Sequence, residues 1–265
     1  MTLINRLPTR TWNRLGVNET ALSWDENGTT EMSPLTVDVT GRKKVVRVEV
    51  NGENEFSRKK VTINAQSETS VTVIEVLSTE NNLAVETELN VKENALVRLI
   101  QVQRSEEKSL VYNKVTSFCD ESGRVELLQV FPGKGDIYSD SLIELTGDKS
   151  SFKSDIGYLG QREQTVDINL VVNHYGKSTE SEINASGALK DSSSKIFRGP
   201  IDFKTGSSDS VGNEKESVLM LGDGVINKTV PLILCAEENV VGNHGATIGE
   251  LDDETLFYFE SRGIG

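Results

Sequence analysis

The sequence predicts an all-β protein built from many short strands. From about residue 35 onward, apolar and polar residues alternate in runs of roughly five to ten residues, which is the pattern of half-buried strands. Turn-forming segments such as 121–123 and 133–135 separate these runs, whose starts recur roughly every 10 to 14 residues. Hydrophobic residues make up 36% of the chain and aromatics only 6%. This composition favours strands closed by polar turns over stacked helices.

The elements follow one another in a simple order. Residues 1–34 read as an irregular or briefly helical lead-in, in which Trp12 and Trp24 are expected to cover an edge of the core. Residues 252–261 have helical spacing of their apolar side chains. Irregular repeats of strand and turn fit a degenerate β-solenoid and a β-sandwich equally well, so periodicity alone leaves both open. Strands are predicted at 45–50, 61–65, 70–76, 84–91, 96–102, 124–131, 140–146, 165–173 and 217–221.

Charge and composition exclude several classes of function. Lys and Arg total 28 against 41 Asp and Glu, for a formal net charge of −13, and no basic stripe offsets it. Nucleic-acid binding is therefore not expected. We find no signal-peptide pattern and no apolar stretch of the roughly 20 residues that a membrane span needs, so a cytoplasmic protein is expected. Cys119 and Cys235 are far apart in the sequence and form no CxxC motif.

The densest motif lies near the end of the chain. Residues 242–254 read Gly-Asn-His-Gly-Ala-Thr-Ile-Gly-Glu-Leu-Asp-Asp-Glu, followed by Leu-Phe-Tyr at 256–258 and Ser-Arg-Gly-Ile at 261–264. Here His244 precedes a Gly-Ala pair, so the backbone can approach another group closely while the imidazole stays free to ligate or titrate. This string resembles, in register over many positions, the end of the core of the SufB/SufD family of iron–sulfur cluster assembly proteins. The resemblance is strongest to the SufD branch.

The resemblance implies a fold and a domain organisation. It implies a right-handed parallel β-helix for residues 35–251, preceded by the lead-in at 1–34. Residues 252–265 would begin a C-terminal helical segment that docks on the ATPase SufC in the family and is truncated here. A solenoid with an uncovered end exposes strand edges, so self-association of the isolated chain is also expected.

The resemblance also implies a function, that of a non-enzymatic scaffold subunit. Such a subunit pairs with SufB, and its histidine, here His244, faces the partner across the interface where a nascent cluster is built. Imidazole is a known iron ligand. Many SufD chains carry a cysteine two residues before this histidine, but this chain has Gly242 there. With so few thiols it cannot ligate a cluster alone, so no cofactor is expected to be held stably and the cluster would be transient at the partner interface.

The remaining candidates carry weaker predictions. Cys235 follows an apolar strand and is interpreted mainly as a buried structural thiol, with a sulfur or iron role as the alternative. Cys119 and His174 are interpreted as structural. Glu250 is the acid singled out as a candidate metal ligand beside His244, while the other nearby acids, 237, 238 and 252–254, read as a solvated rim. No nucleotide-binding or hydrolase motif is found. The rival hypotheses are a SufB-type scaffold and, less favoured, a carbohydrate-active β-helix protein.

Overall fold

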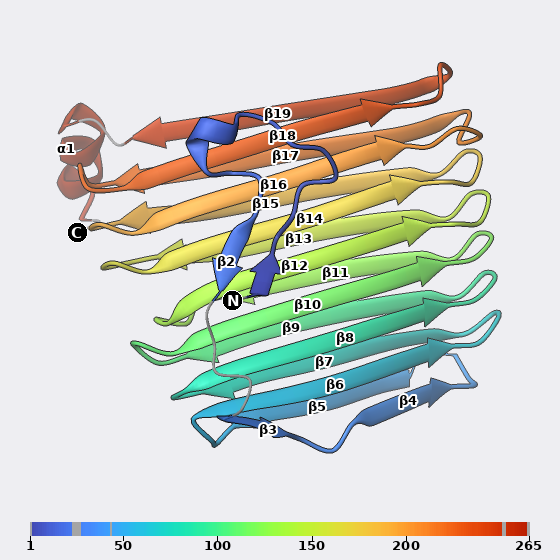
Figure 1. Cartoon of the computed structure of the whole chain (residues 1–265). Helices are drawn as coiled ribbons and strands as arrows, with labels where there is room; N and C mark the ends of the chain where they lie inside the picture. Colours follow the sequence, from blue (N-terminus) through green and yellow to red (C-terminus); the bar gives the residue numbers. More distant parts are fainter. Residues whose placement is uncertain (1, 23–27, 43, 251–252, 264–265) are drawn as a thin grey trace.

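The structure, a computed structural model, is a flattened solenoid in which the chain winds back and forth between two parallel sheets (Figure 1). It describes residues 2–22, 28–42, 44–250 and 253–263, without the side chains of 250 and 253–256. The nine-stranded sheet contains β3 (Thr29–Glu31), β4 (Leu35–Val39), β6 (Phe56–Ala65), β8 (Asn82–Val91), β10 (Leu110–Cys119), β12 (Asp136–Leu145), β14 (Thr165–His174), β16 (Ser194–Phe203) and β18 (Ile226–Cys235). The eight-stranded sheet contains β5 (Lys44–Gly52), β7 (Ser70–Thr79), β9 (Leu96–Ser105), β11 (Arg124–Phe131), β13 (Ser151–Gly160), β15 (Glu180–Lys190), β17 (Ser210–Leu221) and β19 (Val240–Glu250).

Strand pairing identifies the architecture. From β4 onward, consecutive strands lie in opposite sheets, and from β6 onward each strand pairs in parallel with the strand one coil earlier. Leu110 of β10, for example, pairs with Asn82 of β8 and with Asp136 of β12, so a coil takes 28 and 26 residues here. The β-solenoid implied by the resemblance is therefore confirmed, with about eight coils, and the sandwich alternative is wrong. Every predicted strand run falls within a strand of the solenoid or overlaps it.

The turns on one side of the solenoid repeat a single backbone device. A non-glycine residue with positive φ recurs once per coil, and its amide N–H donates to a carbonyl of the next coil. The amide of Asn94 thus bonds the carbonyl of Glu121, at 3.0 Å, and that of Ser122 bonds the carbonyl of Asp148, at 2.8 Å. The left-handed backbone conformation is unfavourable for residues other than glycine, and the hydrogen bonds between stacked turns stabilise it here. The set is Glu68, Asn94, Ser122, Lys149, Ser178 and Asp209.

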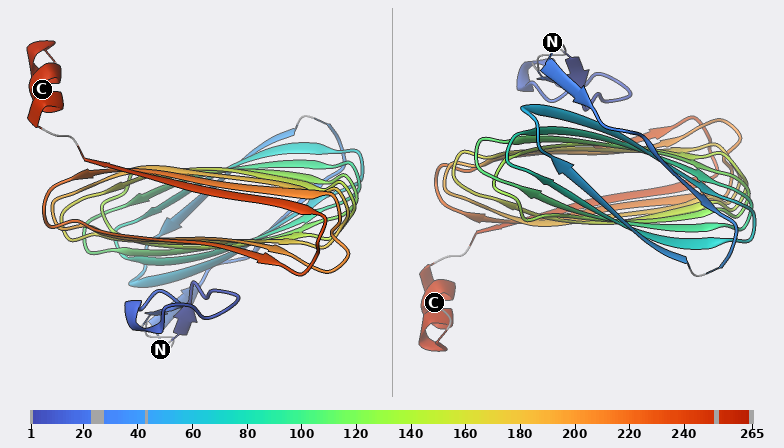
Figure 2. Two further views of the ribbon diagram at one scale, coloured as in Figure 1. Left: turned by 90° about the horizontal axis from the view of Figure 1, so that it is seen from above. Right: turned by 90° about the horizontal axis from the view of Figure 1, so that it is seen from below.

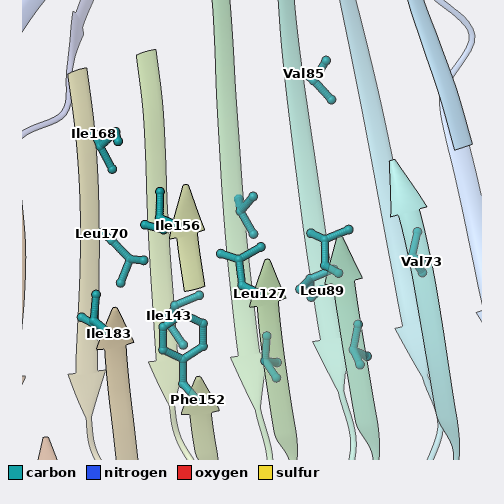
Figure 3. Packing of buried hydrophobic residues seen from close by; sticks show 14 of the residues in the cluster. Val73, Val85, Leu89, Leu127, Ile143, Phe152, Ile156, Ile168, Leu170 and Ile183 are labelled. Carbon is teal, nitrogen blue, oxygen red and sulfur yellow. The ribbon is translucent and has the colours of Figure 1, made fainter. Parts of the chain in front are cut away.

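The core fills the space between the two sheets. Alternate residues of each strand point inward, and the inward positions of the middle coils combine Val, Ile and Leu with buried polar residues such as Gln101 and Asn113. Figure 3 shows residues of this cluster, among them Val73, Leu127 and Ile168, stacked along the solenoid axis. Each fully buried side chain of this kind stabilises the fold by about 1.5–3 kcal/mol.

The N-terminal segment packs against the outer face of the nine-stranded sheet (Figure 2). Its strands β1 (Thr2–Ile4) and β2 (Thr20–Leu22) pair antiparallel, and a short 3-10 helix, η1 (Asn13–Leu15), lies between them. Its apolar side chains form two small clusters with residues on the outer face of the sheet, one that includes Phe56 and one that includes Val230. The prediction that tryptophans cover a core edge is wrong for Trp12, which is 59% exposed because it precedes η1 on the solvent side; Trp24 lies outside the described residues.

The last element is the helix α1 (Asp253–Ser261), which lies to one side of the solenoid, past the end of β19 (Figure 2). It matches the helical spacing predicted for 252–261, with exposed Phe257 and Tyr258. In the part of the chain that the structure describes, no helix is long and apolar enough to cross a membrane.

Candidate functional site

The candidate site lies at the end of the solenoid formed by β18 and β19. In the described chain β19 is the terminal strand of its sheet and pairs along its whole length with β17. The register places His244 beside Glu214 and Ala246 beside Glu216. Glu214 and Glu216 are buried and point inward, so His244 occupies the inward-facing position of the coil above them. No further described strand covers it, and the residue is exposed.

Residues 245–249 belong to the same strand as His244, although two of them are glycines. They continue β19 to Glu250, because parallel pairing with β17 supplies backbone hydrogen bonds to both glycines of the segment. The candidate ligand Glu250 ends this strand, and its side chain lies outside the described residues. The side chains of the acids at 252–254 fall outside them as well.

Gly242 is fitted to its surroundings. A Cβ atom at this position would lie 3.0 Å from Ile233 Cγ2 and 3.2 Å from Phe203 Cε2. These contacts are tighter than a side chain normally accepts, so a cysteine here would have to displace Ile233. The facing strand thus packs close to the backbone two residues before His244.

Cys235 differs from its prediction. It is exposed, not buried, although it stands in register with Phe203, which is completely buried in the coil below. The physical reason is the missing cover: β18 shields Phe203, whereas no described strand lies over Cys235. His244 lies four residues into β19, about 13 Å from the start of that strand, while Cys235 ends the facing strand beside the turn. The structure therefore does not place the two ligand candidates side by side.

A network of buried charges lies directly beneath the open end. Lys195 Nζ pairs with the Glu216 carboxylate, which also accepts hydrogen bonds from Tyr158 Oη at 3.0 Å and Thr229 Oγ1 at 2.6 Å. Burial lowers the pKa of Lys195 against the raising effect of Glu216. Burial and the charge of Glu216 raise the pKa of the Tyr158 phenol. These residues went unrecognised in the sequence, where their only signal is a polar residue at an inward position of a strand.

Glu214 belongs to the same layer but has no partner. Glu214 is 4% exposed, and neither of its carboxylate oxygens has a hydrogen-bond partner in the structure. The facing residue, Gly199, leaves room for it, since a Cβ there would lie 3.0 Å from Glu214 Cγ. Burial, followed by the charge of Glu216, raises the pKa of this carboxyl to about 7, and Lys195 acts in the opposite direction.

The structural interpretations of His174 and Cys119 are confirmed. The His174 ring is buried and its nitrogens contact Thr179 Oγ1 at 2.7 Å and Ser181 Oγ at 2.8 Å, while burial lowers its pKa to about 4. Cys119 is buried, and burial raises its thiol pKa to about 12. Across the described residues, no group of three or more His, Cys, Asp and Glu side chains is arranged to hold a metal ion. Any cluster or cation at His244 would therefore need ligands from elsewhere.

Comparison with known proteins agrees with the motif at His244. Residues 48–265 match the family model described as the SUF system FeS cluster assembly, SufBD core domain. The chain is 33% identical over 130 residues to the iron-sulfur cluster assembly protein SufD of Bacillus subtilis, a match covering 49% of this chain and 30% of that protein. It is 27% identical over 224 residues to an iron-sulfur cluster assembly SufBD family protein of Staphylococcus epidermidis, covering 81% of this chain and 47% of the other.

A third relative, an iron-sulfur cluster assembly SufBD family protein of Galdieria sulphuraria, is 27% identical over 160 residues, which are 59% of this chain and 72% of that one. The chain thus spans less than half the length of the bacterial relatives. The family match covers all coils from β5 onward and includes the open end with His244. The chain belongs to the SufB/SufD core family of iron–sulfur cluster assembly proteins.

Proposed function

We propose that the chain is a SufD-type scaffold subunit that acts without catalytic activity of its own. It pairs through its open end with a SufB-type partner and offers His244 to a cluster that is built transiently between the two chains. Family membership supports the general function in iron–sulfur cluster assembly and replaces the carbohydrate-active alternative. Contact with the ATPase SufC through residues beyond the solenoid, and a cytoplasmic location, remain predictions.

The observation that carries the proposal is the exposure of inward-facing residues on β19. Ile248 is 52% exposed, whereas Val218, its register neighbour one coil below, is 4% exposed. The same contrast holds for His244 and Glu214. Such positions are buried wherever a coil lies above them, so the end of the solenoid is built to receive a cover. A second solenoid of the same family, with strand edges of its own, is the cover that we propose.

A single experiment tests the proposal. The chain is expressed together with SufB and SufC, and the purified complex is compared by visible absorption with the His244→Ala variant. We expect the complex to assemble in both cases and the iron–sulfur absorption to fall in the variant, because an imidazole ligand is lost. Asn243→Ala serves as the matched control, because this neighbour faces outward and its side chain donates to Asn213 Oδ1 at 2.9 Å. Unchanged absorption in His244→Ala would refute the ligand role, and failure to capture SufB would refute the pairing.

A further inference from the structure

Two buried glutamates in the solenoid interior, Glu75 and Glu214, differ in whether their carboxylates are hydrogen-bonded. Glu75 is completely buried, and its oxygens accept hydrogen bonds from Thr87 Oγ1 at 3.1 and 3.2 Å and from Gln101 Nε2 at 2.7 Å. Glu214 is nearly as buried, but both of its oxygens lack a partner. A buried carboxylate without hydrogen bonds opposes folding, so Glu214 is not explained by stability.

The balance of charges around Glu214 favours an additional cation. The interior layer contains Glu214, Glu216 and a single ammonium, that of Lys195. Lys195 Nζ is already engaged by Glu216 and by Thr229 Oγ1, the latter at 3.1 Å. With both acids ionised, the layer carries one uncompensated negative charge, and Glu214 is the acid that lacks a hydrogen-bond partner. A positive ion beside Glu214 would compensate this charge.

The position of His244 supplies a second ligand for such an ion. Glu214 and His244 are register neighbours on adjacent parallel strands, which lie about 4.8 Å apart, and both occupy inward-facing positions. Imidazole nitrogen together with carboxylate oxygen is a ligand pair used for first-row divalent metals. Gly199 faces Glu214 from β16 in the same coil and carries no side chain that would crowd the carboxylate.

We propose that Glu214 and His244 together bind one divalent transition-metal cation at the open end of the solenoid, with Glu214 as a second ligand contributed by this chain. This inference deepens the proposed function and rests on its assignment of His244 to that end. Two protein ligands leave the remaining coordination positions to water or to a partner chain, so the chain alone provides a half-site of modest affinity.

Titration of the 265-residue chain with Co²⁺, followed by visible absorption and calorimetry, tests the inference. We expect one Co²⁺ per chain, and a loss of affinity of about tenfold or more in both Glu214→Gln and His244→Ala. Glu214→Gln keeps the size of the side chain, and circular dichroism and the thermal midpoint verify the fold. Glu238→Gln removes an exposed carboxylate in the turn before β19 and should bind Co²⁺ like the unmodified chain.

Absence of Co²⁺ binding by the unmodified chain overturns the inference, and so does equal affinity in Glu214→Gln. Loss of binding in His244→Ala alone overturns the role of Glu214 while leaving the proposed function intact. Loss in both variants supports the cation site. If the cluster absorption of the His244→Ala complex is nevertheless unchanged, the cation site stands and the proposed role in cluster building fails.

Discussion

Substitution of Arg198 should release the N-terminal segment from the solenoid. Arg198 is fully buried on the outer face of β16 and pairs with Asp167, which is 2% exposed. Its Nε donates to the Val17 carbonyl at 2.6 Å, and its Nη2 donates to Thr20 Oγ1 at 3.2 Å. Asp167 in turn accepts a hydrogen bond from Asn5 Nδ2 at 2.7 Å. One ion pair thus joins two solenoid strands to both ends of the docked segment.

The expected loss in Arg198→Met follows from the burial of this pair. Removal of one partner leaves Asp167 buried without a counter-charge, which typically costs about 3–5 kcal/mol. The matched control is Arg98→Met, which breaks an ion pair with Glu126 whose side chains are about half exposed and should cost about 0–1 kcal/mol. Urea unfolding measures the difference between the two variants.

Hydrogen exchange followed by mass spectrometry tells where the loss occurs. Amides of β1 and β2 should lose protection in Arg198→Met, whereas β8 and β10 in the middle of the nine-stranded sheet should keep theirs. The reasoning is refuted if Arg198→Met unfolds within about 1 kcal/mol of Arg98→Met. Unchanged protection across 2–22 would refute it as well.

Two further predictions concern buried titratable groups. The folded-state pKa of His174 is about 4 against 6.5 in a model peptide, so the unfolded state binds more protons between these values and stability falls as the pH drops from about 6.5 to 4. The loss in the free energy of unfolding approaches about 3 kcal/mol, and it should be absent when the stability of His174→Gln is measured by urea unfolding across the same pH range. An equal dependence on pH in both proteins would contradict the prediction. Iodoacetamide at pH 8 should alkylate Cys235 on the folded chain but spare Cys119, because only Cys235 is exposed. Mass spectrometry should show one adduct before urea and two after it, and a native second adduct would disprove the burial of Cys119.

Alternation along the sequence predicted those strands whose inward residues are apolar. The run at 70–76 has Val71 and Val73 at its first two inward positions and Glu75 at the third, and it lies within β7. Strand β10 escaped prediction because Asn113 and Ser117 occupy inward positions and break the apolar pattern. β13 escaped in the same way through Ser154 and Gly160. The interior of this solenoid is partly polar, and a period of two in hydrophobicity cannot report a polar interior.

Long-range contacts explain the rest of what the sequence did not reveal. The partners of Asn5 and Val17 lie on β14 and β16, far along the chain, so no local pattern indicates that the N-terminal segment docks. Glu214 becomes notable only once the register places it beneath His244. His244 itself was found through its surrounding motif, and composition or periodicity alone would have left it as an ordinary surface residue.

The distribution of side-chain size along β19 suggests how a cover could close over His244. The inward positions on either side of the imidazole are Gly242 and Ala246, and the next is the apolar Ile248. These small neighbours do not shield the imidazole ring, while the exposed Ile248 provides apolar surface that a partner can bury. A partner that covers this end could therefore pack against Ile248 and contact the imidazole, because Gly242 and Ala246 beside it are too small to block access. Because the layer beneath holds Lys195 and Glu216 in a paired network, the only unsatisfied interior acceptor directly below His244 among the described residues is Glu214. Among the described residues of these two strands, the imidazole of His244 and the carboxylate of Glu214 are thus the pair in register that a partner's groups could complete.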